Sequence, residues 1–319
     1  MLDRVNDFFR EKFFPQKKFD SEILQQCCIS IYPNTLHFVH ARLREEKVEI
    51  VLCESFPYKN TKNIQALLTE LVQKYALSGV YCSWILQPEQ YQLLQTESLP
   101  VSPKEFQAAI RWKVKELLSF PIQDAVIDSF PIPVDTASTT VTTIMLVIAR
   151  LSILKPLSDQ ISASGLNLAT IDIPELSLRN LTAVYEKDKK STALIYLQED
   201  NSQLIITHQQ QLYFSRVLNF GIKTLENSIE QALLELQRSF DYFQGQWHFP
   251  IPERILLEST HHVSMNMKDL FSQGLNVVVQ GVDFSEYFTN PLEEKKEGYF
   301  LPLLGSVLRK WNKNDATRN

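Results

Sequence analysis

Apolar side chains recur at helical spacing after residue 102. Four of them, separated by intervals of four, four and three, fall on one helical face: Phe106, Ile110, Val114 and Leu117. Ser102 can cap a first turn that begins with Pro103, and the residue before Pro121 is pushed out of the helical region. The pattern predicts a helix over about residues 103–120 with one buried stripe, followed by an extended segment at AVIDSFPIP.

Strand patterns surround this helix. Period-two alternation in CCISIYPNTLHFVHARLR and KVEIVLCESFPY predicts strands joined by a Pro-Asn turn. A predicted helix at residues 63–76 and the strand VYCSWIL complete a strand-helix-strand order, which is typical of an α/β lobe. Further on, the β-branched run TTVTTIMLVIARL predicts a buried strand. Two helices are expected after it, one over residues 152–164 that ends at Gly165 and one from Pro174.

The charged run at residues 186–191 predicts a boundary between two lobes. The stretch STALIYLQEDNSQLIITHQQQLYFSRVLNFG repeats the strand and turn layout of residues 27–56, which suggests an internal duplication. Helices at 224–242 and 263–271, the strands RILLES and LNVVVQGV, and a last helix at LPLLGSVLR follow. The expected organisation is an amphipathic segment at 1–20, a first lobe at 21–187 with an inserted α+β subdomain at about 84–148, a second lobe at 188–310, and a polar tail at 311–319.

Composition narrows the class of protein. The chain has 319 residues, of which 44% are hydrophobic and 22% charged, and this suits either two domains or one fold with two similar lobes. A net charge of −5 without a basic stripe argues against nucleic-acid binding. No apolar run approaches the ~20 residues of a membrane-spanning helix, and MLDRVNDFFREKFFPQ lacks the apolar region of a secretory signal. We therefore expect a cytoplasmic protein.

Candidate chemistry is sparse. The four cysteines Cys27, Cys28, Cys53 and Cys82 form no CxxC pair, so we expect buried free thiols and no metal site. Asp124 and Asp128 are candidate paired acids, but they lie on a predicted extended segment where alternate polar residues normally face water. No phosphate loop, nucleophile elbow or HExxH motif is present.

The N-terminal segment places aromatic residues among basic ones. Phe8, Phe9, Phe13 and Phe14 can form the apolar side of a short amphipathic helix on an anionic membrane surface. The alternative is a helix docked on the protein's own core, because acidic residues dilute the positive charge of the segment.

Three stretches together resemble PilM-type pilus-assembly proteins. LPVSPKEFQAAIRWKVKELLSFPIQDAVIDSF resembles their helix with a tryptophan-bearing charged turn, an aromatic-proline pair and an acidic strand. In GLNLATIDIPELSLRNL, Asp172 matches a family acid, although it can equally cap a helix. Four residues match a family strand and the glycine-bearing turn after it: Tyr213, Phe214, Arg216 and Gly221.

The likeness runs from about Cys27 to Arg309 and is nearest to the MshI branch, the biogenesis proteins of mannose-sensitive-haemagglutinin type IV pili. It extends more remotely to the cytoplasmic part of the type II secretion L protein. The resemblance implies a two-lobed actin-like fold, that is, a duplicated ribonuclease-H-like α/β fold with an inserted subdomain in the first lobe.

Actin-like proteins ordinarily bind ATP through two glycine-bearing hairpins and a Gly-Gly turn, because glycine lets the backbone approach phosphates closely. None of the eight glycines falls at the corresponding places, which read Pro33-Asn34, Gln198 and Ser259-Thr260. The sequence therefore favours a nucleotide fold that is not an enzyme and has no cofactor. The alternative is an ATPase with non-standard loops, in which Glu199 and Asp200 would act as displaced magnesium ligands.

The resemblance also implies a partner. PilM-type proteins bind the short cytoplasmic tail of a PilN-type inner-membrane protein in a groove of the first lobe, so we expect a scaffold that is peripheral at the inner membrane. Phe106, Ile110 and Trp112 are the candidate contacts. Phe106 and Ile110 fit ordinary core packing equally well, whereas Trp112 departs from the buried stripe. Self-association is also compatible with this fold.

Overall fold

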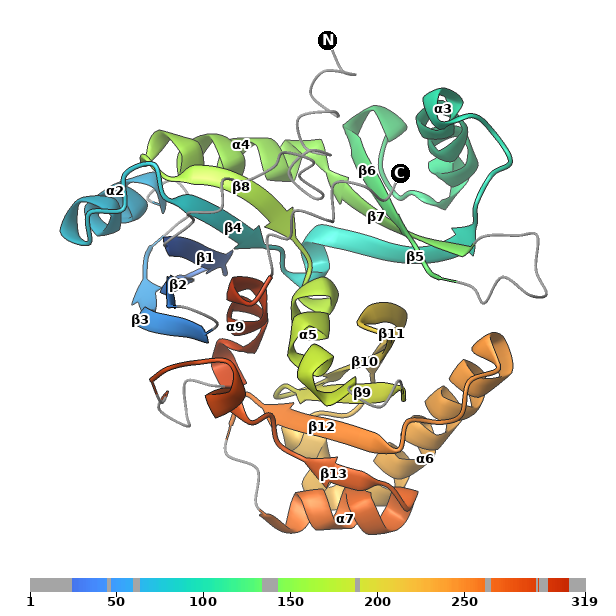
Figure 1. Ribbon diagram of the computed structural model, residues 1–319. Coiled ribbons are helices and arrows are strands. Elements are labelled where there is room, and N and C mark those ends of the chain that lie inside the picture. Colours follow the sequence, from blue (N-terminus) through green and yellow to red (C-terminus); the bar gives the residue numbers. More distant parts are fainter. Residues whose placement is uncertain are drawn as a thin grey trace. The chain divides into compact units, whose positions relative to one another are not determined.

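The computed structural model describes residues 25–44, 47–59, 64–133, 143–186, 190–261, 265–290, 292 and 298–309. Phe8, Phe9, Phe13 and Phe14, the predicted membrane contacts, lie outside these ranges. The chain divides into two compact units (Figure 1), one made of Met1–Phe38, Glu54–Ile173 and Trp311–Asn319, the other of Val39–Cys53 and Pro174–Lys310. The lobe boundaries expected from the sequence stay predictions.

A five-stranded mixed sheet forms the centre of the first unit. Its order is β3 (Lys47–Pro57), β2 (Thr35–Arg44), β1 (Gln25–Ile31), β4 (Tyr81–Ile85) and β8 (Asn167–Asp172), with the hairpin ends of β2 and β3 grouped with the second unit. The pairs β1–β4 and β4–β8 are parallel. Helices α2 (Ile64–Lys74) and α4 (Leu151–Ala163) contact each other, and α4 ends before Gly165, whose φ of +99° suits glycine. The predicted helices at 63–76 and 152–164 are confirmed.

A smaller antiparallel sheet is inserted between β4 and β8. Its order is β5 (Tyr91–Glu97), β7 (Thr143–Arg150) and β6 (Ala125–Pro131), and α3 (Pro103–Val114) packs on one face. Short 3₁₀ turns lie at Pro88–Gln90, Lys115–Leu117 and Ile122–Asp124. The core under α3 consists of Ile110, Val114, Ala125, Ile127, Ile144, Leu146 and Ile148. Strand β5 was not predicted from the sequence.

The predicted stripe is wrong at one position, Leu117. The α-helix ends at Val114 and continues as a 3₁₀ turn, which advances each residue further around the axis, and Leu117 is 64% exposed. Leu118 packs against the core instead. The predicted helix end at Phe120 is therefore six residues late.

The second unit is built on another five-stranded sheet. Its order is β11 (Gln211–Leu218), β10 (Ser202–His208), β9 (Thr192–Leu197), β12 (Arg254–Ser259) and β13 (Val278–Gln280). When the five strands of each sheet are numbered 1 to 5 in chain order, both sheets have the strand order 3-2-1-4-5. This confirms the repeat layout predicted from the sequence.

Within the described residues, the helices of the second unit are α5 (Pro174–Thr182), α6 (Ile222–Trp247), α7 (Met265–Leu275) and α9 (Leu301–Val307), with 3₁₀ turns at Ala183–Glu186 and Phe284–Glu286. Gly305 lets α9 lie directly against α5, since a Cβ there would be 2.2 Å from the Ser177 carbonyl oxygen. The hairpin end of β3 joins this unit through the Val48 amide, which donates to the Tyr287 carbonyl at 3.0 Å. Within the described ranges, no helix has the length and apolar composition needed to cross a bilayer.

Candidate functional site

The turn between β9 and β10 stands where the resemblance places the second phosphate hairpin. Inside the turn, the Gln198 amide donates to the Asn201 carbonyl at 3.0 Å. The first amides of helix α6 also donate into the turn, Ile222 to the Gln198 carbonyl at 2.8 Å and Lys223 to the Glu199 carbonyl at 3.1 Å. A helix N-terminus that binds phosphate offers these amides to the ligand. In this chain they are bonded to the protein's own backbone.

Gly221 makes this contact between helix and turn possible. A Cβ at position 221 would lie 2.5 Å from the Glu199 carbonyl oxygen and 2.6 Å from the Asn201 nitrogen, and both are backbone atoms. Glycine here provides room for the chain itself, not for a ligand. Gly221 is the residue that matched the family's glycine-bearing turn in sequence.

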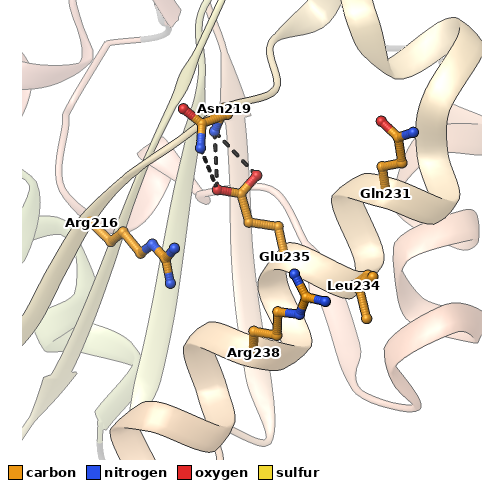
Figure 2. A pocket seen from close by; sticks show the side chains of 6 residues that line it. All are labelled: Arg216, Asn219, Gln231, Leu234, Glu235 and Arg238. Atoms are coloured by element: carbon orange, nitrogen blue, oxygen red, sulfur yellow. Dashed lines mark hydrogen bonds between the residues drawn. The ribbon is translucent and has the colours of Figure 1, made fainter.

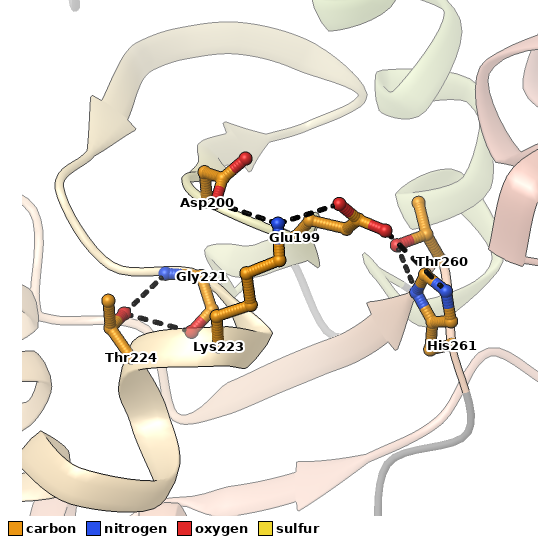
Figure 3. Close-up of polar contacts among 7 residues, drawn as sticks. All are labelled: Glu199, Asp200, Gly221, Lys223, Thr224, Thr260 and His261. Atoms are coloured by element: carbon orange, nitrogen blue, oxygen red, sulfur yellow. Dashed lines mark hydrogen bonds and ion pairs between the residues drawn. The ribbon is translucent and has the colours of Figure 1, made fainter.

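Two acids of the same turn share one lysine (Figure 3). The Lys223 ammonium lies 2.9 Å from Glu199 Oε2 and 3.2 Å from Asp200 Oδ1, and the hydrogen bonds that it donates to these carboxylates raise the pKa of Lys223. The positions proposed for displaced magnesium ligands therefore face an ammonium group. Among the residues that the structure describes, no cluster of three or more His, Cys, Asp or Glu side chains could hold a metal ion.

The turn after β12 corresponds to the place of the adenosine turn, Ser259-Thr260. The Thr260 amide donates to the Leu197 carbonyl at 2.9 Å. Gly298 lies directly on this turn, because a Cβ there would be 1.6 Å from the Ser259 carbonyl oxygen. The Tyr196 hydroxyl donates to the Gly298 carbonyl at 2.9 Å and holds the segment in place.

Tyr299 and His261 continue the contact at the surface. The Tyr299 hydroxyl lies 2.8 Å from His261 Nε2, and this nitrogen is 3.8 Å from Glu199 Oε1. The segment after Gly298 is thus linked through His261 to the β9–β10 turn. The two places of the second unit where a nucleotide would be held are joined to each other by side chains of this chain.

The Pro33-Asn34 turn of the first unit is closed in a similar way. The Tyr32 amide donates to the Thr35 carbonyl at 2.9 Å, and the Tyr58 amide donates to the Asn34 carbonyl at 2.9 Å. The Tyr58 hydroxyl also donates to the Tyr32 carbonyl. Proline has no amide to offer, and the Tyr32 and Tyr58 amides donate to carbonyls of the protein itself.

The three candidate partner residues lie in two different environments. Ile110 is 1% exposed and belongs to the core under α3, and Phe106 packs partly buried against the same core. Trp112 is 81% exposed, the highest value among the large hydrophobic side chains of the described residues. Its neighbours fix the helix, since the Arg111 guanidinium donates to the Ile122 carbonyl at 2.6 Å and the Lys113 ammonium to the Glu97 carbonyl at 3.0 Å. Trp112 is therefore presented to solvent on an anchored helix.

The candidate acids Asp124 and Asp128 do not form a pair. Asp124 accepts hydrogen bonds from the Ser152 amide at 2.8 Å and hydroxyl at 2.7 Å, at the start of α4. Burial alone would raise the pKa of Asp124, but these bonds and the Arg150 guanidinium outweigh it and lower the pKa. The expectation that Asp128 faces water is wrong, because its side chain is only 3% exposed. The sheet face opposite α3 is buried as well, with Val126 and Val147 each 1% exposed.

A pocket that the sequence did not predict lies between β11 and α6 (Figure 2). Its lining consists of Arg216, Asn219, Gln231, Leu234, Glu235 and Arg238. A signal for it was present in the sequence, because Leu234 and Arg238 are four residues apart and lie off the buried helical stripe of Leu225, Leu236 and Phe240. Of the residues that line the pocket, the sequence pointed only to Arg216, as one of those that match the family strand.

No protein-family model and no curated protein matches this sequence. Among solved structures, a chain of the PilM–PilN type IV pilus biogenesis complex is similar, with a TM-score of 0.69 and 16% identity over 91% of this chain and 99% of that chain. The cytoplasmic domain of EpsL, an inner-membrane component of the type II secretion system of Vibrio cholerae, is similar with a TM-score of 0.50 and 10% identity over 92% of this chain and 98% of that chain.

These likenesses extend over nearly the whole chain and agree with the repeated strand order of the two sheets. The expected two-lobed actin-like α/β fold is confirmed.

Proposed function

We propose that this protein is a non-catalytic scaffold of a type IV pilus assembly machine, of the MshI kind, which binds the cytoplasmic tail of a PilN-type inner-membrane protein. The observation that carries the proposal is the end-to-end likeness to the PilM–PilN complex chain, which leaves no large part of either chain unmatched. The protein would then act at the cytoplasmic face of the inner membrane.

The state of two turns of the second unit supports a role without nucleotide chemistry. Phosphate binding by this fold needs free backbone amides, whereas those of Ile222 and Lys223 donate to turn carbonyls. An ammonium lies between the two acids that could bind magnesium. The turn after β12 is covered by Gly298. A nucleotide would have to displace each of these contacts before it could be held.

The exposed face of α3 supports a docking role. A tryptophan that is exposed in the free protein and fixed on an anchored helix loses little conformational freedom on binding, and tryptophan is enriched among residues that dominate interface energetics. Trp112 meets both conditions. Phe106 packs partly buried against the core under α3, so it has less surface to offer a partner.

The test is titration of the full chain with a synthetic peptide of the cytoplasmic tail of the PilN-type protein from the same organism. Replacing an interface tryptophan typically costs about 2–4 kcal/mol, so Trp112→Ala should weaken binding about 30-fold or more. Leu270→Ala, at another exposed apolar residue (45% exposed) in the second unit, is the matched control and should bind as wild type does. Unchanged binding by Trp112→Ala would remove this residue from the site.

Catalytic inactivity has a separate test. Isothermal titration with magnesium-ATP should give no heat of binding, and the melting temperature should not move with ATP concentration, because a ligand of the folded state would stabilise it. Stabilisation that grows with ATP would favour the alternative function, an ATPase of pilus or type II secretion assembly. Peptide binding and ATP binding are measured independently, so either part of the proposal can fail alone.

A further inference from the structure

Helix α6 runs antiparallel beside strand β11. Three contacts in order show this: the rings of Phe214 and Tyr242 have centroids 5.8 Å apart, Arg216 Nη1 donates to Ser239 Oγ at 3.3 Å, and the Asn219 side-chain amide donates to Glu235 at 3.1 Å. From the first contact to the third, residue numbers increase along the strand and decrease along the helix. The pocket of Figure 2 is part of the groove between these two elements.

Strand β11 is at the edge of its sheet. Among the described strands it pairs only with β10. An edge strand presents alternate backbone N–H and C=O groups that can pair with another extended segment. The outer side of β11 therefore offers main-chain hydrogen bonds along the length of the groove.

The opposite wall is a ridge of three residues on α6. Leu234, Arg238 and Tyr242 are four positions apart, and Leu234 and Tyr242 are 52% and 53% exposed. Successive ridge residues rise by about 6 Å in a helix, while alternate side chains of a strand are about 6.6 Å apart. An extended segment paired with β11 would therefore place every second side chain opposite one ridge residue.

The middle of the ridge is positively charged. Within the part of the chain that the structure describes, the Arg238 guanidinium makes no hydrogen bond or ion pair, and Arg216 on the facing strand donates only to Ser239. The acids nearest to Arg238 along the helix accept hydrogen bonds from other groups. Glu235, which also lines the pocket, accepts from the Asn219 amides, and Asp241 accepts from Gln237. The centre of the groove thus lies between two guanidinium groups, which suit a carboxylate.

We propose that this groove docks an extended segment of a partner protein with the pattern apolar-x-acidic-x-apolar. The segment adds a strand to the open side of β11, a recognised mode of peptide binding. Its acidic side chain lies between Arg216 and Arg238, and its two apolar side chains lie against Leu234 and Tyr242. The residues of this surface belong to the second unit, whereas Trp112 belongs to the first.

Fluorescence anisotropy with two labelled peptides tests the charge selection. The peptide KTLTDTLTK carries the proposed pattern, and ETLTKTLTE reverses its charges. Wild type should bind the acidic-centred peptide about tenfold more tightly than the reversed one. Arg238→Glu should invert this preference, and Lys74→Glu, a charge-matched change in the first unit, should leave it unchanged. Equal affinity of wild type for both peptides, absence of binding, or an unaltered preference in Arg238→Glu would overturn the proposal.

Two further measurements separate docking from misfolding and from self-binding. Leu234→Ser should weaken the acidic-centred peptide while the melting temperature stays at the wild-type value, because this side chain is half exposed. A peptide of residues 1–19 is the competing probe, since Val5, Asp7 and Phe9 carry the same alternation in sequence. Tighter binding of that peptide than of KTLTDTLTK would identify the chain's own segment as the occupant and overturn the assignment to a separate partner.

Discussion

Replacement of Gly221 by alanine tests how the β9–β10 turn is held against helix α6. The added Cβ would lie 2.5 Å from the Glu199 carbonyl oxygen and 2.6 Å from backbone atoms of Asp200 and Asn201. Such contacts require the turn or the start of the helix to move by about 1 Å to reach ordinary van der Waals distance. Neither side can yield by rotating a flexible side chain, because the atoms on both sides belong to the main chain.

The expected cost has two parts. Overpacking a closely packed site costs about 1–3 kcal/mol. The displacement also weakens the hydrogen bonds from the Ile222 and Lys223 amides to the turn, 2.8 and 3.1 Å long, each worth about 1 kcal/mol. Gly221→Ala should therefore lower the free energy of unfolding by about 2–4 kcal/mol.

Gly245→Ala, near the other end of the same helix, is the matched control. A Cβ at this position would meet no atom within 4 Å outside the adjacent residues and nearby backbone of its own helix, so alanine should stabilise the helix by about 0.5–1 kcal/mol relative to glycine. Urea unfolding followed by circular dichroism measures both variants, with comparison of midpoints at unchanged slope. A Gly221→Ala midpoint at or above that of wild type would refute the close approach, and an equal loss in both variants would refute its assignment to the turn.

Two ionisable residues give further predictions. Burial lowers the pKa of His37 from 6.5 in the unfolded chain to about 4 in the folded protein. The folded protein therefore has its full stability above pH 6.5 and loses stability as the pH falls from 6.5 toward 4. Between about pH 7.5 and pH 5 this amounts to about 2 kcal/mol, which urea titrations at the two pH values should show in wild type and not in His37→Gln. Asp124→Ala should cost about 1 kcal/mol at neutral pH, because it removes the acceptor for the first turn of α4. Because the folded pKa of Asp124 is lowered, the difference between this variant and wild type should fade as pH drops through that pKa, and a difference that persists in acid would contradict the assigned role.

Local sequence signals predicted most elements of the fold. The helix expected at 224–242, the strands expected after residue 190, Gly165 at the end of α4 and Pro174 at the start of α5 all depend on residues close together in sequence, and each element is present as expected. The identical strand order of the two five-stranded sheets follows from the repeated layout. The resemblance to PilM-type proteins supplied the global arrangement, which spacing alone could not give.

The errors share a physical cause, since each depends on what covers a segment in three dimensions. Strand β5 pairs with β7, which lies more than forty residues later in the chain, so no local pattern predicts the pairing. Asp128 alternates with buried residues in sequence, but the sheet is covered on both faces. Leu117 fits the helical period, but the helix tightens after Val114 and rotates it into solvent. Periodicity identifies a face and does not say what lies against it.

Two glycines of the second unit lie against turns that correspond to nucleotide-binding places. The sequence has no glycine within the three turns that correspond to nucleotide-binding places, but a Cβ added at Gly221 or at Gly298 would lie within 3 Å of main-chain atoms of two of these turns. The close approach that the fold reserves for a nucleotide in ATP-binding relatives is here made by the chain to itself. Each such contact uses donors or space that a nucleotide would need, and each stabilises the second unit without a ligand. The proposed scaffold role requires a shape that persists without a nucleotide, and these contacts are consistent with that requirement.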